Sequence, residues 1–292
     1  LAKPMTAHIE TAELHGQPVL KLQTPDGAVA LISLFGAQVL SWIGQGQERL
    51  FLSPRAAHDG HRAIRGGIPL CWPQFNRRGS LPKHGFARLL PWTITQQNAS
   101  SLTLSLCSND VPPAWLHGTQ SEPLWSHPFE ATVRVKLLPG QLTLHLWVRN
   151  GGNTPMPFTA ALHGYLATGG QTAHACIMGA DGLRYWNASP DANPEYPAQQ
   201  GPIRFTGGVD CVYPAFASTL THGNGQHLKL CQSASFGQTV VWNPGATLCA
   251  RLPDMPADAW RDFVCIEAAQ IDTPALLAPG DLWHGWQSFQ AC

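Results

Sequence analysis

The chain has 292 residues, of which 12% are charged, and its 18 lysines and arginines balance 18 aspartates and glutamates. This balance creates no global basic field that would attract nucleic acid or an anionic membrane, and it leaves open a local basic pocket. The sequence carries no secretory signal and no uninterrupted apolar stretch of membrane-spanning length, so we expect neither nucleic acid nor a membrane as a partner.

Alternating apolar and polar residues, the pattern of a half-buried strand, recur along the chain. The segments 131–137 and 142–148 flank Pro139-Gly140, which predicts a β-hairpin. One short helix is expected near 256–262. The full set of expected strands is 18–23, 28–34, 37–43, 102–106, 131–137, 142–148, 157–166, 228–231, 238–242, 263–268 and 284–289.

The abundance of turn-forming residues supports the same class of fold. Glycine and proline contribute 28 and 25 residues, which is typical of many short strands joined by tight turns. Because no pattern of long helices alternates with the strands, we expect an all-β protein, a large antiparallel β-sandwich with few short helices. Residues 1–292 are expected to form a single domain, with the proline-rich stretch 187–202 as a surface excursion.

The eight cysteines form no CxxC pair, so zinc-ribbon and thioredoxin patterns are absent from the sequence. Several lie inside apolar runs, among them Cys107 and Cys265. Free buried cysteine behaves as a small hydrophobic residue. We therefore expect reduced thiols and a cytoplasmic protein.

The segments 65–75 and 81–88 combine glycines and prolines with two arginines, a histidine, a glutamine and several aromatic residues. Glycine and proline interrupt helix and strand alike, which predicts an ordered loop. Loops that concentrate such side chains often bind a polar ligand. The alternative is an ordinary long connection with a few surface charges. The candidate ligand-binding residues of this loop are Arg65, Gln74, His84 and Arg88.

Three further polar residues lie in or beside expected strands. His163 interrupts an apolar strand, where a hydrogen-bonded core histidine is the alternative, and Asp210 follows Gly207-Gly208, where a turn-stabilising role would suffice. Glu267 lies among Phe, Val, Cys, Ile and Ala. A carboxylate there needs a partner, and partial burial would raise its pKa and make it a better base. The residues alone indicate a His/Arg/carboxylate site for a small hydroxylated or anionic ligand.

Taken in chain order, these motifs resemble those of the aldose 1-epimerase superfamily, and most of all its glucose-6-phosphate 1-epimerase branch. The resemblance covers roughly residues 15–290. It rests on 64–69, 72–75, 84–88 with Pro91-Trp92, 162–163, 210–213, 241–244, 264–268 and 279–283.

The resemblance implies a galactose mutarotase-like sandwich that interconverts the anomers of a hexose 6-phosphate, glucose 6-phosphate above all. By position, Glu267 corresponds to the general base that takes the proton of the anomeric hydroxyl O1. His163 corresponds to the general acid that protonates the ring oxygen O5, and we expect the two on opposite sides of the sugar ring. The chemistry requires no cofactor and no metal.

The remaining candidates correspond to substrate ligands, since arginine can hold two phosphate oxygens at once and His and Asp can hold sugar hydroxyls. They are Arg65, Gln74, His84, Arg88 and Asp210. Two positions depart from the branch: Cys211 stands where arginine is usual, and Gly164 where threonine is common. The first departure leaves open which hexose is preferred and whether phosphate is required.

Three alternatives remain open from the sequence. A mutarotase for free aldoses and a non-catalytic carbohydrate-binding protein would use the same fold, although a pure binder has no need of an acid–base pair. A metalloenzyme would account for the thirteen histidines, but no HExxH motif or paired cysteines accompany them. We expect a monomer or a weak oligomer whose partner is a small sugar phosphate.

Overall fold

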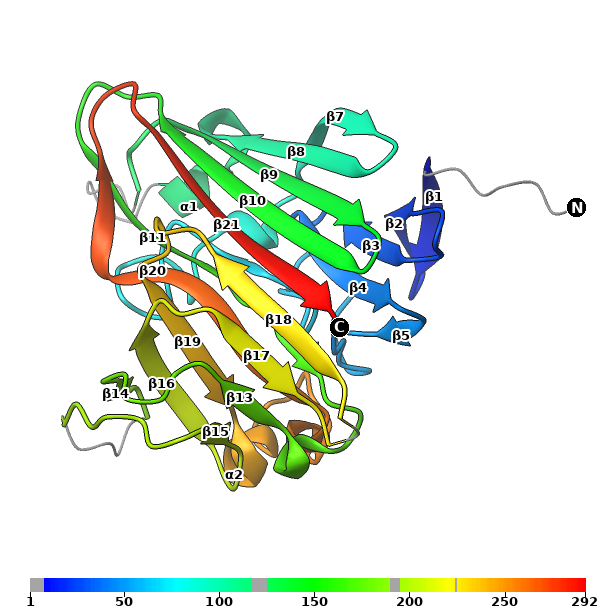
Figure 1. Ribbon diagram of the computed structural model, residues 1–292. Helices are drawn as coiled ribbons and strands as arrows, with labels where there is room; N and C mark the ends of the chain where they lie inside the picture. Colours follow the sequence, from blue (N-terminus) through cyan, green and yellow to red (C-terminus); the bar gives the residue numbers. More distant parts are fainter. Residues whose placement is uncertain (1–7, 117–124, 190–194, 224) are drawn as a thin grey trace, which may run out of the picture.

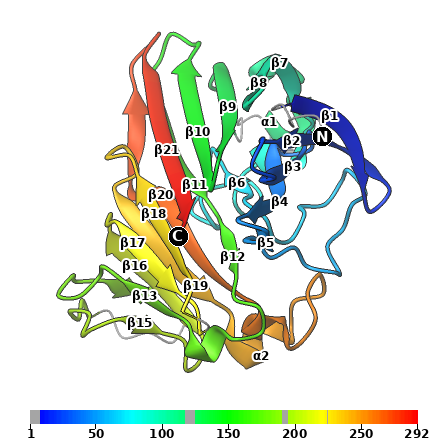
Figure 2. The same cartoon turned by 45° about the vertical axis from the view of Figure 1, so that its right-hand side comes forward.

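The computed structural model describes residues 8–116, 125–189, 195–223 and 225–292. Within these residues the strands form three antiparallel sheets (Figure 1). The N-terminal sheet, blue on one flank of the molecule in Figure 2, has five strands in chain order. They are β1 (His8–Leu14), β2 (Gln17–Gln23), β3 (Val29–Ser33), β4 (Gln38–Gly44) and β5 (Gln47–Glu48).

The second sheet has nine strands, and the C-terminal strand lies inside it rather than at an edge. From one edge to the other these strands are β15 (Ile203–Arg204), β13 (Cys176–Met178), β17 (Ser218–Thr221), β18 (His227–Gln232), β21 (Leu282–Ala291), β10 (Gln141–Asn150), β9 (Phe129–Leu138), β8 (Ser101–Cys107) and β7 (Thr93–Asn98). The hairpin expected from 131–137 and 142–148 is confirmed as β9 and β10, in which Leu142 faces Leu137 across the turn.

The third sheet has seven strands. They are β14 (Trp186–Asn187), β16 (Val209–Pro214), β19 (Gln238–Asn243), β20 (Phe263–Leu277), β11 (Met156–Leu162) and β6 (Leu70–Cys71), with β12 (Tyr165–Ala167) also paired to β20. The expected strand 157–166 is thus divided into β11 and β12, and the expected strand 263–268 continues to Leu277.

Helices are few and short, as expected for this class of fold. The described residues contain α1 (Pro113–Leu116), α2 (Gly245–Cys249) and single 3₁₀ turns at Ala87–Leu89, Ser108–Asp110, Thr172–His174 and Ala259–Arg261. The helix expected near 256–262 is the last of these turns. No described helix is long and apolar enough to cross a membrane. All eight cysteines are free, as expected.

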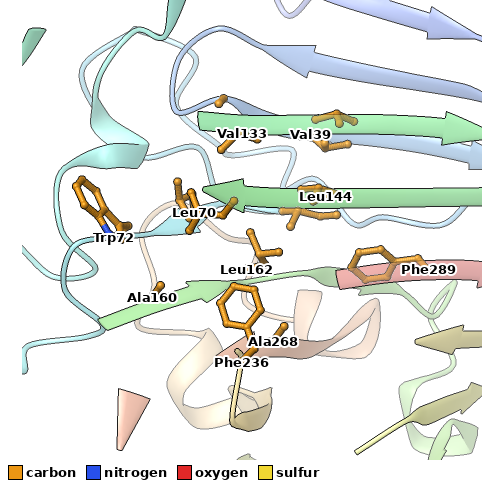
Figure 3. Packing of buried hydrophobic residues seen from close by; sticks show 14 of the residues in the cluster. Val39, Leu70, Trp72, Val133, Leu144, Ala160, Leu162, Phe236, Ala268 and Phe289 are labelled. Carbon is orange, nitrogen blue, oxygen red and sulfur yellow. The ribbon is translucent and has the colours of Figure 1, made fainter. Parts of the chain in front are cut away.

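The main core lies between the nine-stranded and seven-stranded sheets, because each sheet turns the apolar residues of its alternating strands toward the other. Figure 3 shows Leu144 of β10, Phe289 of β21, Leu162 of β11 and Ala268 of β20 among the side chains that fill this layer. The N-terminal sheet joins the same core through Trp42, whose ring lies 6.4 Å from that of Phe289. The all-β sandwich predicted from the sequence is therefore confirmed.

Candidate active site

The segment that follows Arg65 is fixed by backbone hydrogen bonds on both sides. Gly67 donates to the carbonyl oxygen of Phe51 at 2.7 Å and accepts from the N–H of Tyr165 at 2.9 Å. It has a φ of +61°, and a Cβ there would collide with the carbonyl oxygen of Val39. Only glycine meets both demands. The loop is consequently ordered where the sequence predicted order, and it lies against the start of β12.

The register of β11 and β12 on β20 places His163 opposite Glu267. Leu162 pairs with Ala268 and Tyr165 pairs with Cys265, so the position between them that faces Glu267 is His163. Residues opposed in an antiparallel pair have Cβ atoms about 5 Å apart and share one face of the sheet. Ile266 and Ala268 point into the main core, so Glu267 and His163 project from the outer face of the seven-stranded sheet.

The two side chains are in contact. His163 Nε2 lies 3.3 Å from Glu267 Oε1, and the side chains are 10% and 1% exposed, respectively. His163 Nδ1 and Glu267 Oε2 are buried and have no hydrogen-bond partner within the described structure. An unsatisfied buried polar atom is costly and needs an explanation, of which a catalytic role is one. Two of them on one contacting pair mark this position as the strongest candidate for chemistry.

Burial controls the protonation of the pair. It raises the pKa of Glu267 well above its ordinary value, and the negative charge of Asp210 adds to the effect. Burial also lowers the pKa of His163 well below its ordinary value, and the positive charges of Arg65 and Arg88 act in the same direction. Both shifts favour a protonated carboxyl and a neutral imidazole in the free protein, with one proton between them.

Tyr165 supports the imidazole from one side. Its ring lies parallel to that of His163, with centroids 4.8 Å apart and planes inclined by 9°. The Tyr165 hydroxyl accepts a hydrogen bond of 2.9 Å from Arg65 Nη1. Arg65 Nε in turn donates to Asp254 Oδ2 at 3.0 Å. Arg65 is thereby held next to the ring that backs His163.

His84 supports the imidazole from a second direction, with its ring edge-on to that of His163 at 5.6 Å. Its backbone has a φ of +66°, and its Nδ1 accepts the N–H of Asn76 at 3.3 Å. Burial, followed by the positive charge of Arg88, holds the pKa of His84 well below its ordinary value. His84 is therefore a neutral ring, and Nε2–H is the donor that it can offer to a ligand.

Two more cations lie beside Arg65. Arg88 donates from Nη2 to the carbonyl oxygen of Lys83 at 2.7 Å, while its Nε is buried without a partner in the described structure. Partial desolvation, and then the charges of Arg65 and Arg88, lower the pKa of Lys83. We call Arg65, Lys83 and Arg88 the cation cluster. Crowded cations with an unused donor favour binding of an anion.

Asp210 borders the site on the side away from His84. It lies on the outer face of the seven-stranded sheet, in the line of paired residues that crosses β20 at Cys265, two residues before Glu267. It pairs with Trp242, which pairs with Cys265. Burial raises the pKa of Asp210 to about 6, against opposing effects of Lys83 and Arg78. An acidic group that titrates near neutral pH can either donate to or accept from a sugar hydroxyl.

Of the seven residues singled out from the sequence, Gln74 has a different environment from the one expected. Its amide donates to the carbonyl oxygens of Asn76 and Leu81 and accepts from the N–H of Leu81, each at 3.0 Å. The side chain therefore braces the loop that carries Lys83 and His84. A direct contact between Gln74 and a substrate would have to replace these bonds.

Cys211 and Gly164, the two residues that depart from the branch pattern, both face the main core. Cys211 is buried in the main core, on the opposite face of β16 from Asp210. The cysteine thus removes no charged group from the outer face of this sheet. A Cβ at Gly164 would lie at ordinary van der Waals distance, 3.6 Å, from the ring of Phe289. Glycine at that position therefore leaves the outer face unchanged as well.

Sequence reasoning missed three residues of the site. Lys83 lies in the loop that the sequence singled out, and Tyr165 lies two residues beyond His163 on the same face, so both could have been found from spacing. Asp254 lies in a turn between α2 and β20, and no local pattern marks it as a partner of Arg65.

Comparison with known proteins gives concordant results. The family described as Aldose 1-epimerase matches residues 18–290. A protein of Cenchrus ciliaris named "Putative glucose-6-phosphate 1-epimerase" is 32% identical over 275 residues, which cover 88% of this chain and 79% of that protein. A protein of Escherichia coli strain K12 with the same name is 31% identical, over 82% of this chain and 79% of its own.

Solved structures share the fold. The crystal structure described as "a putative mutarotase (YeaD) from Salmonella typhimurium" has a TM-score of 0.81 and 24% identity, and the match covers 100% of this chain and 96% of that one. Galactose 1-epimerase from Lactobacillus acidophilus NCFM has a TM-score of 0.69 and 13% identity, over 98% and 99% of the two chains. At these identities the likeness establishes the galactose mutarotase-like fold alone.

Proposed function

The chain belongs to the aldose 1-epimerase family, and on this premise we propose that it interconverts the α and β anomers of a hexose 6-phosphate, with glucose 6-phosphate as the expected substrate. The observation that carries the proposal is the contact of 3.3 Å between His163 and Glu267, next to the cation cluster. The names of the Cenchrus and Escherichia relatives support the same substrate.

Anomer exchange needs two coordinated proton transfers. Glu267 as a carboxylate takes the proton from O1 while His163 as an imidazolium gives a proton to O5, so that the C1–O5 bond breaks as the C1=O1 bond forms. Rotation about the C1–C2 bond turns the other face of the aldehyde toward O5. The same groups then act in reverse and close the ring. Each positioned acid or base contributes roughly 10²–10⁴ to the rate.

The contact between the two groups changes one expectation. The resemblance implies an acid and a base on opposite sides of the ring, whereas the side chains of His163 and Glu267 lie side by side. Because O1 and O5 are both bonded to C1, a sugar lying over the pair presents both oxygens to it at once. A separation of 3.3 Å is at the long end of the range for a hydrogen bond, so a proton can pass between the two groups and each group can still turn to its own oxygen.

The rest of the site serves to hold the sugar in this position. His84, through Nε2–H, and Asp210 are suited to sugar hydroxyls, since one offers a fixed donor and the other titrates between donor and acceptor. Arg65 and Arg88 are suited to the phosphate, because a guanidinium binds two phosphate oxygens in parallel.

The test is anomer exchange measured by NMR, with glucose 6-phosphate and glucose as paired substrates. We expect kcat/KM to be higher for the phosphorylated sugar by at least about a hundredfold, since a charge-assisted phosphate contact contributes several kcal/mol. Glu267→Gln should lose the exchange of both sugars and keep its fold. Equal kcat/KM for the two sugars would exclude a hexose 6-phosphate as the preferred substrate.

A further inference from the structure

The cation cluster is only partly neutralised by the protein. Arg65 forms an ion pair with Asp254 at 3.0 Å, whereas neither Lys83 nor Arg88 has a carboxylate within ion-pair distance in the described part of the chain. The buried Nε of Arg88 has no hydrogen-bond partner there either. Excess positive charge therefore surrounds one side of the His163–Glu267 pair before any ligand arrives.

This charge acts unequally on the two members of the pair. Burial has the largest effect on both groups. Among the charges, those of Arg65 and Arg88, and then Lys83, act on His163, whereas those of Asp210 and Lys83 act on Glu267, so the two arginines bear on His163 alone. The contacts agree with this division, because Arg65 bonds to the hydroxyl of the tyrosine that is stacked on His163. The groups that face the pair from all surrounding elements are Arg65, Cys71, Lys83, His84, Arg88, Tyr165, Asp210 and Cys265.

The resting and the reactive forms of the pair contain the same number of protons. Burial of both groups and the cations beside His163 favour a resting form with the proton on the Glu267 carboxyl and a neutral imidazole at His163. In the reactive form the proton is on His163 and Glu267 is a carboxylate. Moving the proton across the contact breaks the Oε1–H bond and forms the Nε2–H bond, and no proton is exchanged with solvent. Only the electrostatic surroundings decide between the two forms.

We propose that the anionic group of the substrate switches the pair into its reactive form. An anion bound between Arg65 and Arg88 cancels the positive charge that opposes an imidazolium at His163, so the shared proton moves from Glu267 to His163. The phosphate of the sugar is then a part of the catalytic machinery as well as a means of binding. This inference rests on the proposed function, because it requires a phosphorylated sugar as the substrate.

If the phosphate of the substrate switches the pair, its presence should raise kcat. An anion added as a separate molecule should have the same effect. A neutral sugar leaves the proton on Glu267 and is turned over slowly even at saturation. Inorganic phosphite, a small dianion, should then accelerate the exchange of free glucose. An opposite charge close to a titrating group shifts its pKa by about one to three pH units, so we expect an increase in kcat of about tenfold or more.

The direct measurement is NMR of the imidazole nitrogens in histidine-labelled protein near neutral pH. The ligands are the analogue of glucose 6-phosphate that lacks the anomeric hydroxyl and its counterpart without phosphate, neither of which can open. We expect His163 to become an imidazolium with the phosphorylated analogue and to stay neutral with the other. Arg88→Lys, which keeps the charge, and Lys229→Met, which removes an exposed cation of β18, are the matched controls for Arg88→Ala.

In Arg88→Ala the ratio of kcat for free glucose to kcat for glucose 6-phosphate should rise. The change removes a charge that opposes the imidazolium, which favours turnover of free glucose, and it also removes part of the anion site, which disfavours turnover of glucose 6-phosphate. Neutral His163 with the phosphorylated analogue bound, together with equal kcat for the two sugars, would overturn the inference. If kcat/KM still favours glucose 6-phosphate in that case, the proposed function stands and phosphate is only a means of binding. If kcat/KM does not favour it, both fail.

Discussion

The rings of Tyr165 and His163 lie parallel, with centroids 4.8 Å apart, and the hydroxyl of Tyr165 faces away from the stack toward Arg65. One side chain therefore fixes the plane of the imidazole and also connects it to the cation cluster. Packing on a rigid neighbour of this kind holds a catalytic group in one rotamer.

Tyr165→Phe should separate these two tasks, because the ring stays and the hydrogen bond to Arg65 is lost. A hydrogen bond to a charged group contributes about 1.5–3 kcal/mol. We expect the free energy of unfolding to decrease by an amount in that range. The KM for glucose 6-phosphate should rise while that for glucose changes little. Tyr213→Phe, which removes a hydroxyl bonded to Gln199 at 2.8 Å on the core side of β16, is the control for stability. An equal rise of KM in both variants would contradict the assignment.

His163→Gln should reduce kcat for anomer exchange by roughly 10²–10⁴, because an amide of similar size is far too weak an acid to protonate O5. The fold should survive, since the amide can still accept from the protonated Glu267. Thermal unfolding and NMR exchange of the same sample check both statements. A near-normal kcat with an intact fold would remove His163 from the reaction.

Asp210→Asn should change how stability depends on pH. Burial raises the pKa of Asp210 in the folded protein from its ordinary 3.8 to about 6, so the folded state holds this proton more tightly than the unfolded state. The contribution is complete below the ordinary pKa and is lost as the pH rises through about 6. Across this window the variant should gain up to about 3 kcal/mol relative to the wild type, at about 1.4 kcal/mol for each pH unit between the two values. Urea unfolding at a series of pH values measures this gain, and parallel curves for the two proteins would argue against a raised pKa of Asp210.

Gln74→Ala tests whether this side chain braces its loop or binds the substrate. Three hydrogen bonds are lost with the amide, which should lower the free energy of unfolding by about 3 kcal/mol. The loop that carries His84 should loosen, and hydrogen exchange of the amides in 74–84 should become faster. Unchanged stability with a strongly raised KM would identify Gln74 as a direct substrate ligand instead.

The strands that the sequence predicted best are those with one face in the main core. In β10 every second residue from Leu142 to Val148 is buried, and the apolar–polar alternation is correspondingly regular. Strand β20 was recognised only to Ala268, because beyond it the chain runs through Asp272 and Thr273, which are exposed, and the alternation ends. The short strands β5, β6, β14 and β15 are two residues long, and no pattern can be detected over that length.

The site was predictable in its residue types and unpredictable in its geometry. An isolated glutamate in an apolar run indicated a special environment for Glu267, but its partner depends on the register between β12 and β20. That register is set by contacts such as Tyr165 with Cys265, which belong to distant parts of the sequence. A shift of one residue would turn His163 into the core. The ion pair of Arg65 with Asp254 likewise joins distant parts of the sequence, so no local pattern could predict it.

The order of the strands has a consequence for synthesis on the ribosome. β20 lies between β19 and β11, and β21 lies between β18 and β10, so the last two strands complete the interior of both sheets. Until they emerge, the nascent polypeptide exposes the unpaired edges of strands that were translated much earlier, which are templates for aggregation. A message truncated before Glu267 would yield a product that lacks the proposed base and has two open sheets.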